Sequence, residues 1–139
     1  MQAQLSYLTL LVADVALSVQ FYQALGWILY QQHKDFAVFR LDNGVRLALL
    51  NAQAAGKLYA PLCKQNVNQS SILLSHNVAN LACCTAILQQ ARSAGARHIQ
   101  EVQRADWGAW VAYFQDLDGY AWELTYQEDA KLDISGYLV

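Results

Sequence analysis

The stretch WGAWVAYFQDLDGYAWEL, residues 107–124, decides the fold of this chain. It contains two runs rich in aromatic and aliphatic residues, as is typical of β-strands. Between them lies Asp116-Leu117-Asp118-Gly119, and Asp and Gly are residues that favour tight turns. The stretch therefore predicts a hairpin with strands at residues 110–115 and 120–126.

The residues before this hairpin complete one structural unit. Residues 71–76 and 97–103 are predicted strands, and residues 79–94 are a predicted helix, with Asn80 near its start and Gly95 closing it. The first half of the chain has the same order of elements. A strand at residues 5–13 and Asp14 at an N-cap position precede a helix at residues 15–25, which Gly26 closes. Strands follow at 27–32, 36–41 and 45–50, and Asp42-Asn43-Gly44 joins the last two as a strong hairpin signal.

This repeated order predicts an α+β fold of two βαβββ modules. Val12-Ala13-Asp14 opens the first helix as Val78-Ala79-Asn80 opens the second. Helices on one face of each sheet leave the other face to be covered, and curved mixed sheets around a shared cleft would cover it. We expect a single domain over residues 1–139, with module one at about 5–51, a linker at 52–69, module two at about 70–126 and a tail at 127–139. The linker holds the only proline, Pro61, and we expect one short helical turn there.

Composition excludes several classes of protein. The 139 residues are 55% hydrophobic and 14% charged, with a net charge of −2, so neither a disordered chain nor a basic nucleic-acid-binding surface is expected. No apolar run is long enough for a membrane span, and the N-terminus lacks a basic leader, so we expect a cytoplasmic protein. Cys63, Cys83 and Cys84 lack the spacing of a zinc or redox site, and we expect reduced thiols. The 12% aromatic content favours a ligand pocket or an oligomer.

Motifs at both ends of the chain resemble those of the vicinal-oxygen-chelate superfamily, which includes glyoxalases, bleomycin-resistance proteins and extradiol dioxygenases. At the N-terminal end the resemblance rests on Leu8-Thr9-Leu10-Leu11-Val12-Ala13-Asp14, Ser18, Phe21-Tyr22 and Leu25-Gly26. At the C-terminal end it rests on Trp107-Gly108, Tyr113-Phe114, Asp116-Leu117-Asp118-Gly119 and Glu123-Leu124. It covers about residues 5–126. Leu117 and Tyr120 depart from the family pattern, but the turn-forming Asp and Gly remain.

The resemblance also implies where a metal would bind. Enzymes of the family hold one divalent ion with His or Glu side chains from the first, fourth, fifth and eighth strands. Those positions fall on Tyr7, on Leu49 or Leu50, within residues 71–73, and on Glu123. Because a lone carboxylate cannot replace the hydration shell of a divalent ion, we expect no metal and no other cofactor.

The three histidines do not change this expectation. His76 is expected on the other face of its strand, because a shift by an odd number of residues reverses the side chain. His33 and His98 show no ligand spacing.

Glu123 allows three interpretations. Period-two alternation places it opposite Trp122 and Leu124, so if those two pack on a helix, Glu123 faces the cleft. It is then either a relic paired with an arginine or a tyrosine hydroxyl, a counter-charge for a polar or cationic ligand, or an acid–base group.

Seven residues are predicted to bind ligand, namely Tyr7, Leu49, Tyr59, Leu73, Trp107, Trp110 and Glu123. Their aromatic rings suit a flat hydrophobic molecule or a cation, although Trp110 fits the core almost as well. We expect Trp27, Trp122 and Phe114 to belong to the core.

The resemblance implies a metal-independent protein that binds a small hydrophobic or aromatic molecule, cations included, as metal-free members bind drugs such as bleomycin without reacting with them. We therefore favour a binding protein over an enzyme. The alternative is a metal-dependent lyase or dioxygenase that uses Glu123 with non-standard ligands. A third hypothesis is an interaction module with a collapsed cleft. Family members commonly dimerise, so we expect a homodimer, and residues 127–139 are a candidate segment to cover the partner. A monomer with this tail folded back remains open.

Overall fold

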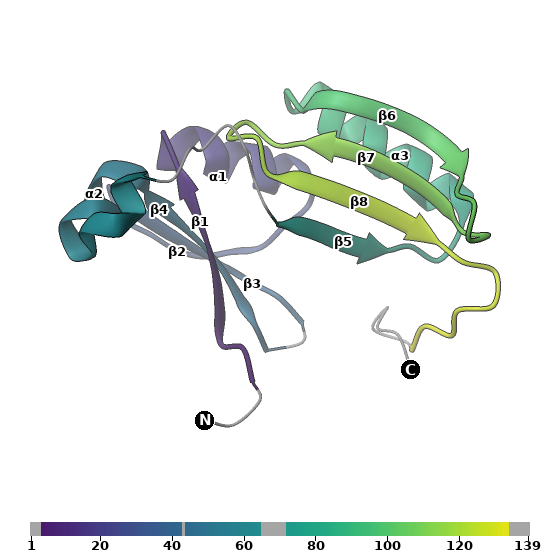
Figure 1. The fold of residues 1–139 in the computed structure, drawn as a ribbon, viewed down its shortest axis with the longest axis horizontal. Helices are drawn as coiled ribbons and strands as arrows, with labels where there is room; N and C mark the ends of the chain where they lie inside the picture. The colour runs from purple at the N-terminus through teal and green to yellow at the C-terminus, as the bar shows by residue number, and fades with distance from the viewer. Residues whose placement is uncertain (1–3, 43, 65–71, 134–139) are drawn as a thin grey trace. The chain divides into compact units, whose positions relative to one another are not determined.

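The computed structural model describes residues 4–42, 44–64 and 72–133, and of residues 63 and 64 it describes the backbone only (Figure 1). The chain divides into two compact units, Met1–Val67 and Asn68–Val139, each of which is described by itself below. No helix among the described residues is long and apolar enough to cross a membrane.

The first unit is a four-stranded mixed sheet with a helix on one face. Its elements are β1 (Tyr7–Val12), α1 (Val15–Ala24), β2 (Leu29–Gln32), β3 (Phe36–Arg40), β4 (Arg46–Asn51), α2 (Ala52–Leu58) and the 3₁₀ helix η1 (Ala60–Lys64). The strand order is β1-β4-β3-β2, in which only β1 and β4 run parallel.

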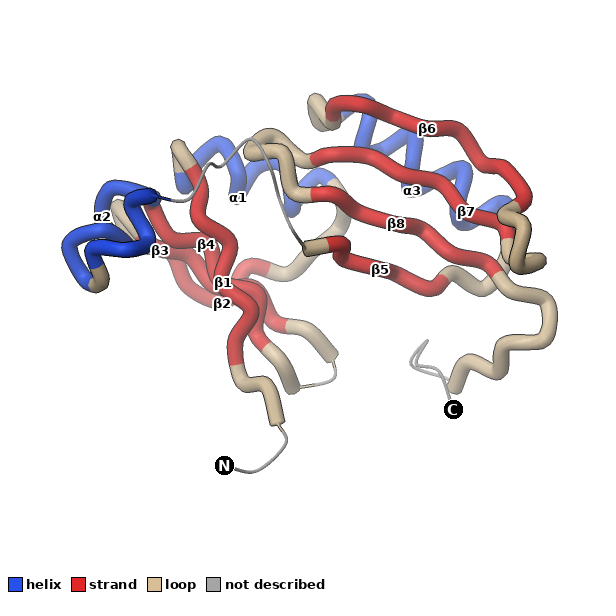
Figure 2. Tube along the Cα trace, in the orientation of Figure 1, coloured by secondary structure: helices blue, strands red, loops and turns tan. Residues whose placement is uncertain are grey.

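The second unit repeats this arrangement. Its elements are β5 (Leu73–Asn77), α3 (Leu81–Ser93), β6 (Arg97–Arg104), β7 (Trp110–Gln115) and β8 (Ala121–Tyr126). The strand order is β5-β8-β7-β6, again with one parallel pair, and α3 lies along one face of the sheet (Figure 2). The predicted α+β fold of two βαβββ modules is therefore confirmed.

The helices α1 and α3 begin and end in the same way. The side chain of Asp14 accepts a hydrogen bond from the amide of Leu17, and that of Asn80 accepts one from Cys83. The C-terminal end of each helix is followed by a glycine with positive φ, +87° at Gly26 and +100° at Gly95. The amide of the residue after each glycine donates a hydrogen bond to the carbonyl of the residue five positions earlier, which is the Schellman pattern.

Three hairpin turns share one geometry. In each, the amide of a glycine donates a hydrogen bond to the carbonyl of the residue three positions earlier. The amide of that earlier residue donates a hydrogen bond to the carbonyl of the residue that follows the glycine. The glycines are Gly44, Gly108 and Gly119, with φ between +84° and +104°. In the last turn the carboxylate of Asp116, itself 1% exposed, accepts bonds of 2.9 Å from the amides of Asp118 and Tyr120. These short turns fix the register of the strands that they join.

Each sheet buries one face against its helix. In the first unit, Phe39 contacts Tyr22 of α1 with ring centroids 5.8 Å apart. In the second, Phe114 and Trp122 stack at 6.4 Å and lie on the face that α3 covers. We call the opposite face of each sheet its distal face. Alternation and register assign to it Tyr7, Thr9, Leu11, Val38, Arg40, Arg46, Ala48 and Leu50 in the first unit, and Leu73, Ser75, Asn77, Val111, Tyr113, Ala121, Glu123 and Thr125 in the second.

Most predicted elements agree with the structure to within one or two residues. The linker does not, because two helical segments, α2 and η1, replace the single short turn that we expected. The side chain of Asn51 caps α2 by accepting bonds from the amides of Gln53 and Ala54. This capping, together with the alanines of α2, outweighs the weak periodicity of the segment.

The predicted core aromatic residues of the second unit, Phe114 and Trp122, are buried, as expected. Trp27 is half-buried and packs on Tyr22 with centroids 5.4 Å apart. Of the cysteines, Cys84 is buried on α3 and Cys83 is exposed, both as free thiols.

Candidate functional site

The carboxylate of Glu123, on the distal face of the second sheet, accepts hydrogen bonds from two neighbouring side chains. Ser75, its neighbour on β5, donates a 2.9 Å hydrogen bond to Oε1. Tyr113, its neighbour on β7, donates a 2.6 Å bond to Oε2. Trp122 and Leu124 are buried on the other face, so Glu123 lies on the face opposite them, as alternation along the strand predicts. We considered an arginine and a tyrosine hydroxyl as partners of this carboxylate, and the structure contains the tyrosine hydroxyl.

The hydrogen bond from Tyr113 is strong enough to change the titration of its phenol. The bond to Glu123, followed by partial burial and the nearby negative charge, raises the pKa of Tyr113 to about 12. The phenol therefore stays protonated at neutral pH and remains a donor. A carboxylate has about four lone-pair sites, so these two bonds leave Glu123 able to accept further hydrogen bonds.

In the first unit, Ala48 occupies the position that corresponds to Glu123 in the second. Glu123 lies opposite Ser75 and Tyr113, and in the first sheet Ala48 lies opposite Thr9 and Val38 in the same registers. Ala48 also follows Gly44 by four residues, as Glu123 follows Gly119. The fourth-strand position, which we placed on Leu49 or Leu50, is therefore assigned to Ala48, whose methyl group cannot bind a metal.

These residues do not fit a divalent-metal site of the family type. Of the other family positions, Tyr7 offers a phenol, and Leu73 offers no donor. Among the residues that the structure describes, no three His, Cys, Asp or Glu side chains gather in one place. A lone carboxylate whose oxygens already accept two hydrogen bonds is a poor ligand set for such an ion.

Two other predicted ligand-binding residues of the second unit are accessible from solvent. Leu73 lies on the distal face of β5 and is exposed. Trp107 is exposed in the turn between β6 and β7. Trp110 instead shares the α3 face with Phe114, and the guanidinium of Arg104 lies 5.9 Å from its ring centroid. Trp110 is thus on the opposite side of the sheet from Glu123.

The predicted residues of the first unit also divide between two faces. Tyr7 lies on the distal face, beside Arg46 of β4, and Tyr59 is exposed at the end of α2. Leu49 is 0% exposed and lies on the face that packs against α1. No ligand can reach it there, so we transfer its proposed role to Leu50, which is half-buried on the distal face.

Sequence reasoning missed Ser75 and Tyr113 as partners of Glu123. The sequence could have predicted Tyr113, because the turn at Asp116 to Gly119 fixes the register of β7 and β8. It could not have predicted Ser75, because the parallel pairing of β5 with β8 has no connecting turn from which to count the register.

The three histidines lie on separate elements of the chain. His76 shares the face of Leu124, as expected, and although it belongs to the exposed residues of β5, desolvation of its imidazole lowers its pKa. His33 is exposed and hydrogen-bonds Gln31, and His98 is exposed at the start of β6.

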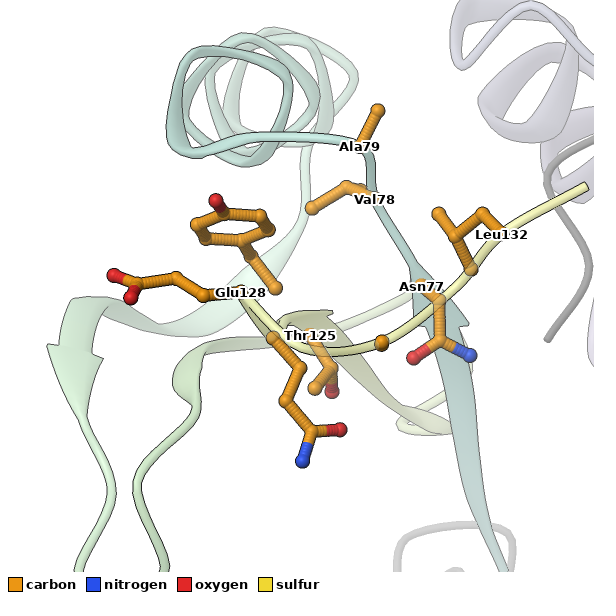
Figure 3. Close-up of a pocket in the computed structure, with 9 residues that line it drawn as sticks. Asn77, Val78, Ala79, Thr125, Glu128 and Leu132 are labelled. Carbon is orange, nitrogen blue, oxygen red and sulfur yellow. The ribbon is translucent and has the colours of Figure 1, made fainter. Parts of the chain in front are cut away.

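A small pocket of about 170 Å³ lies elsewhere in the second unit. It forms between the ends of β5 and β8 and the segment that follows β8. Figure 3 shows Asn77 and Thr125 beneath that segment, which carries Glu128 and Leu132. None of the residues that we predicted to bind ligand lines this pocket.

Comparison with known proteins supports the fold and its assignment. The family model described as the Glyoxalase/Bleomycin resistance protein/Dioxygenase superfamily matches residues 4–124. The chain belongs to this superfamily. No curated protein sequence matches it closely enough to count as a relative.

Solved structures of the superfamily have the same fold at low sequence identity. A glyoxalase-related enzyme from Fulvimarina pelagi is 20% identical, with a TM-score of 0.89 over 99% of this chain and 98% of that one. A lactoylglutathione lyase from Agrobacterium tumefaciens is 14% identical, with a TM-score of 0.69 over 92% and 96%. A bleomycin-binding protein in complex with bleomycin is 17% identical, with a TM-score of 0.63 over 91% and 100%. An enzyme and a drug-binding protein thus have this fold.

Proposed function

We propose that this superfamily member is a metal-independent binding protein for a small hydrophobic or aromatic molecule, cationic ones included. The observation that carries the proposal is the carboxylate of Glu123, held by Ser75 and Tyr113 on the distal face of the second sheet. A fixed carboxylate with free lone pairs can pair with a cation or accept a hydrogen bond from a ligand.

The two other contacts that we propose in the second unit, Leu73 and Trp107, suit an organic ligand. Leu73 is an apolar contact on the same face, and Trp107 is an exposed ring at the hairpin end. Planar rings give a large contact area at small entropic cost and stack on flat ligands. In the first unit, Tyr7, Leu50 and Tyr59 are further proposed contacts. The bleomycin-binding structure shows that this fold can serve such a role in another protein.

Fluorescence titration tests the proposal, because the chain contains four tryptophans. Metal-free bleomycin and the planar cation 9-aminoacridine are titrated into protein treated with EDTA, and quenching that saturates at one equivalent is expected. The protein is then reloaded with nickel, zinc or iron(II), and elemental analysis should find less than about a tenth of an equivalent bound.

The metal-dependent lyase or dioxygenase would give the opposite result. One tightly held equivalent of metal that is lost in Glu123→Gln, but kept in Glu128→Gln, would overturn the proposal. Glu128 is an exposed carboxylate beyond β8, so its variant controls for the loss of one negative charge.

We also propose that the protein is a cytoplasmic homodimer. The exposed apolar side chains, which include Ile28, Leu58 and Trp107, could be buried in a dimer interface. Light scattering after size exclusion should give twice the 15.6 kDa of one chain, and a mass of one chain at micromolar concentration would refute the dimer.

A further inference from the structure

Two arginines and a tyrosine form a compact cluster on the distal face of the first sheet. Arg40 and Arg46 lie directly opposite each other on β3 and β4. Their guanidinium carbons are 5.8 and 5.6 Å from the ring centroid of Tyr30 on β2. Both distances are within the range of cation–π contacts, so one ring attracts two cations.

Among the residues that the structure describes, no carboxylate forms an ion pair with either arginine. Guanidinium groups stay protonated at any physiological pH, and like charges directly opposite each other on neighbouring strands destabilise a sheet. A salt bridge joins Arg92 to Glu101 in the second unit, and neither Arg40 nor Arg46 takes part in it. Asp35 and Asp42 flank β3 in sequence, but neither forms an ion pair with Arg40 or Arg46.

The cluster also presents a flat surface beside its charges. The side chain of Tyr30 is 60% exposed, although both guanidinium groups lie near its ring. A shift in register between Leu29 and Gln31 places Tyr30 at an irregularity of β2. Tyr7 adds a second exposed ring, next to Arg46 across the β1–β4 pair.

We propose that Arg40, Arg46 and Tyr30 form a binding site for a small planar organic anion, of which an aryl carboxylate is the representative. The carboxylate accepts hydrogen bonds from both guanidinium groups and removes their repulsion. The attached ring packs on the exposed aromatic surface of Tyr30 or Tyr7. This site lies wholly in the first unit and does not depend on the proposed role of Glu123.

Equilibrium dialysis with 2-naphthoate tests the site, and 2-naphthamide is the neutral probe of the same shape. The wild-type protein should bind naphthoate at least tenfold more tightly than naphthamide. Arg40→Gln and Arg46→Gln should each weaken naphthoate binding about tenfold, as expected when one charged hydrogen bond is lost. Tyr30→Phe should keep the affinity, and Tyr30→Leu should reduce it.

Arg104→Gln is the matched control, because it removes the guanidinium that lies 5.9 Å from the ring centroid of Trp110 in the second unit and is not part of the proposed site on the first sheet. It should bind naphthoate as the wild type does. Equal affinity of the wild type for the two probes, or unchanged naphthoate binding in Arg40→Gln/Arg46→Gln, would overturn the proposal. The proposal would also be overturned if inorganic phosphate displaced all of the bound naphthoate and Tyr30→Leu bound naphthoate as tightly as the wild type. The site would then recognise charge alone. Thermal unfolding of each variant confirms that it is folded.

Discussion

The hydroxyl of Tyr113 donates a 2.6 Å hydrogen bond to Oε2 of Glu123, directly across the β7–β8 pair. Tyr113→Phe removes this bond while keeping the ring, so it should lower the free energy of unfolding by about 1 kcal/mol, measured in urea at pH 7. Tyr126→Phe is the control, because its hydroxyl makes no hydrogen bond within the described residues.

The same bond predicts a dependence on alkaline pH. The pKa of Tyr113 is raised to about 12 in the folded chain, from 10.0 as the ordinary value. The stability that the bond contributes is therefore complete below about pH 10 and is lost as the pH rises through about 12. The difference in unfolding free energy between wild type and Tyr113→Phe should shrink over this window. A difference that stays constant from pH 9 to 12 would show that the phenol is not so perturbed.

Glu123→Gln should distinguish charged from neutral ligands. Because the amide keeps the shape and loses the negative charge, affinity for the cation 9-aminoacridine should fall about tenfold, and affinity for neutral acridine should not change. Fluorescence titration at pH 7.5 measures both. Equal loss for the two dyes would indicate a structural effect, and no loss for either would remove Glu123 from the ligand site.

Asp116→Ala should be among the more destabilising changes in the second unit. The carboxylate is buried and accepts hydrogen bonds from the amides of Asp118 and Tyr120, and the substitution would remove both bonds. We expect a loss of about 2 kcal/mol in urea unfolding, and a smaller loss in Asp116→Asn, whose amide oxygen can still accept. If the two variants were equally stable, the turn would not depend on these bonds.

Alanine at the two helix-closing glycines should separate backbone strain from crowding. At Gly26 a Cβ would meet nothing within 4 Å, so Gly26→Ala should cost only the strain of positive φ, about 1 kcal/mol. At Gly95 the Cβ would lie 3.3 Å from Cδ2 of Leu117. Thermal unfolding should therefore rank Gly95→Ala below Gly26→Ala, and the reverse order would contradict this account.

The sequence was sufficient to predict all the strands and the helices α1 and α3, because turn glycines and helix caps mark most of their ends, but it did not predict α2 and η1. It was also sufficient to place Glu123 opposite Trp122, since alternation along one strand needs no partner. Leu49 was misplaced because an error of one residue reverses the face of a strand. The cluster at Tyr30 was missed because it depends on a local irregularity of β2 and on the pairing of two separate strands.

The matching positions of Ala48 and Glu123, each four residues after its turn glycine, show how the two halves can differ in chemistry without differing in backbone. The length of each hairpin, more than the residues in it, determines which side chains reach the distal face. A single residue inserted between Gly119 and Glu123 would carry the carboxylate to the face that α3 covers, away from Ser75 and Tyr113. Substitutions in these hairpins can therefore alter what the protein binds, whereas insertions and deletions would disrupt both the binding site and the core.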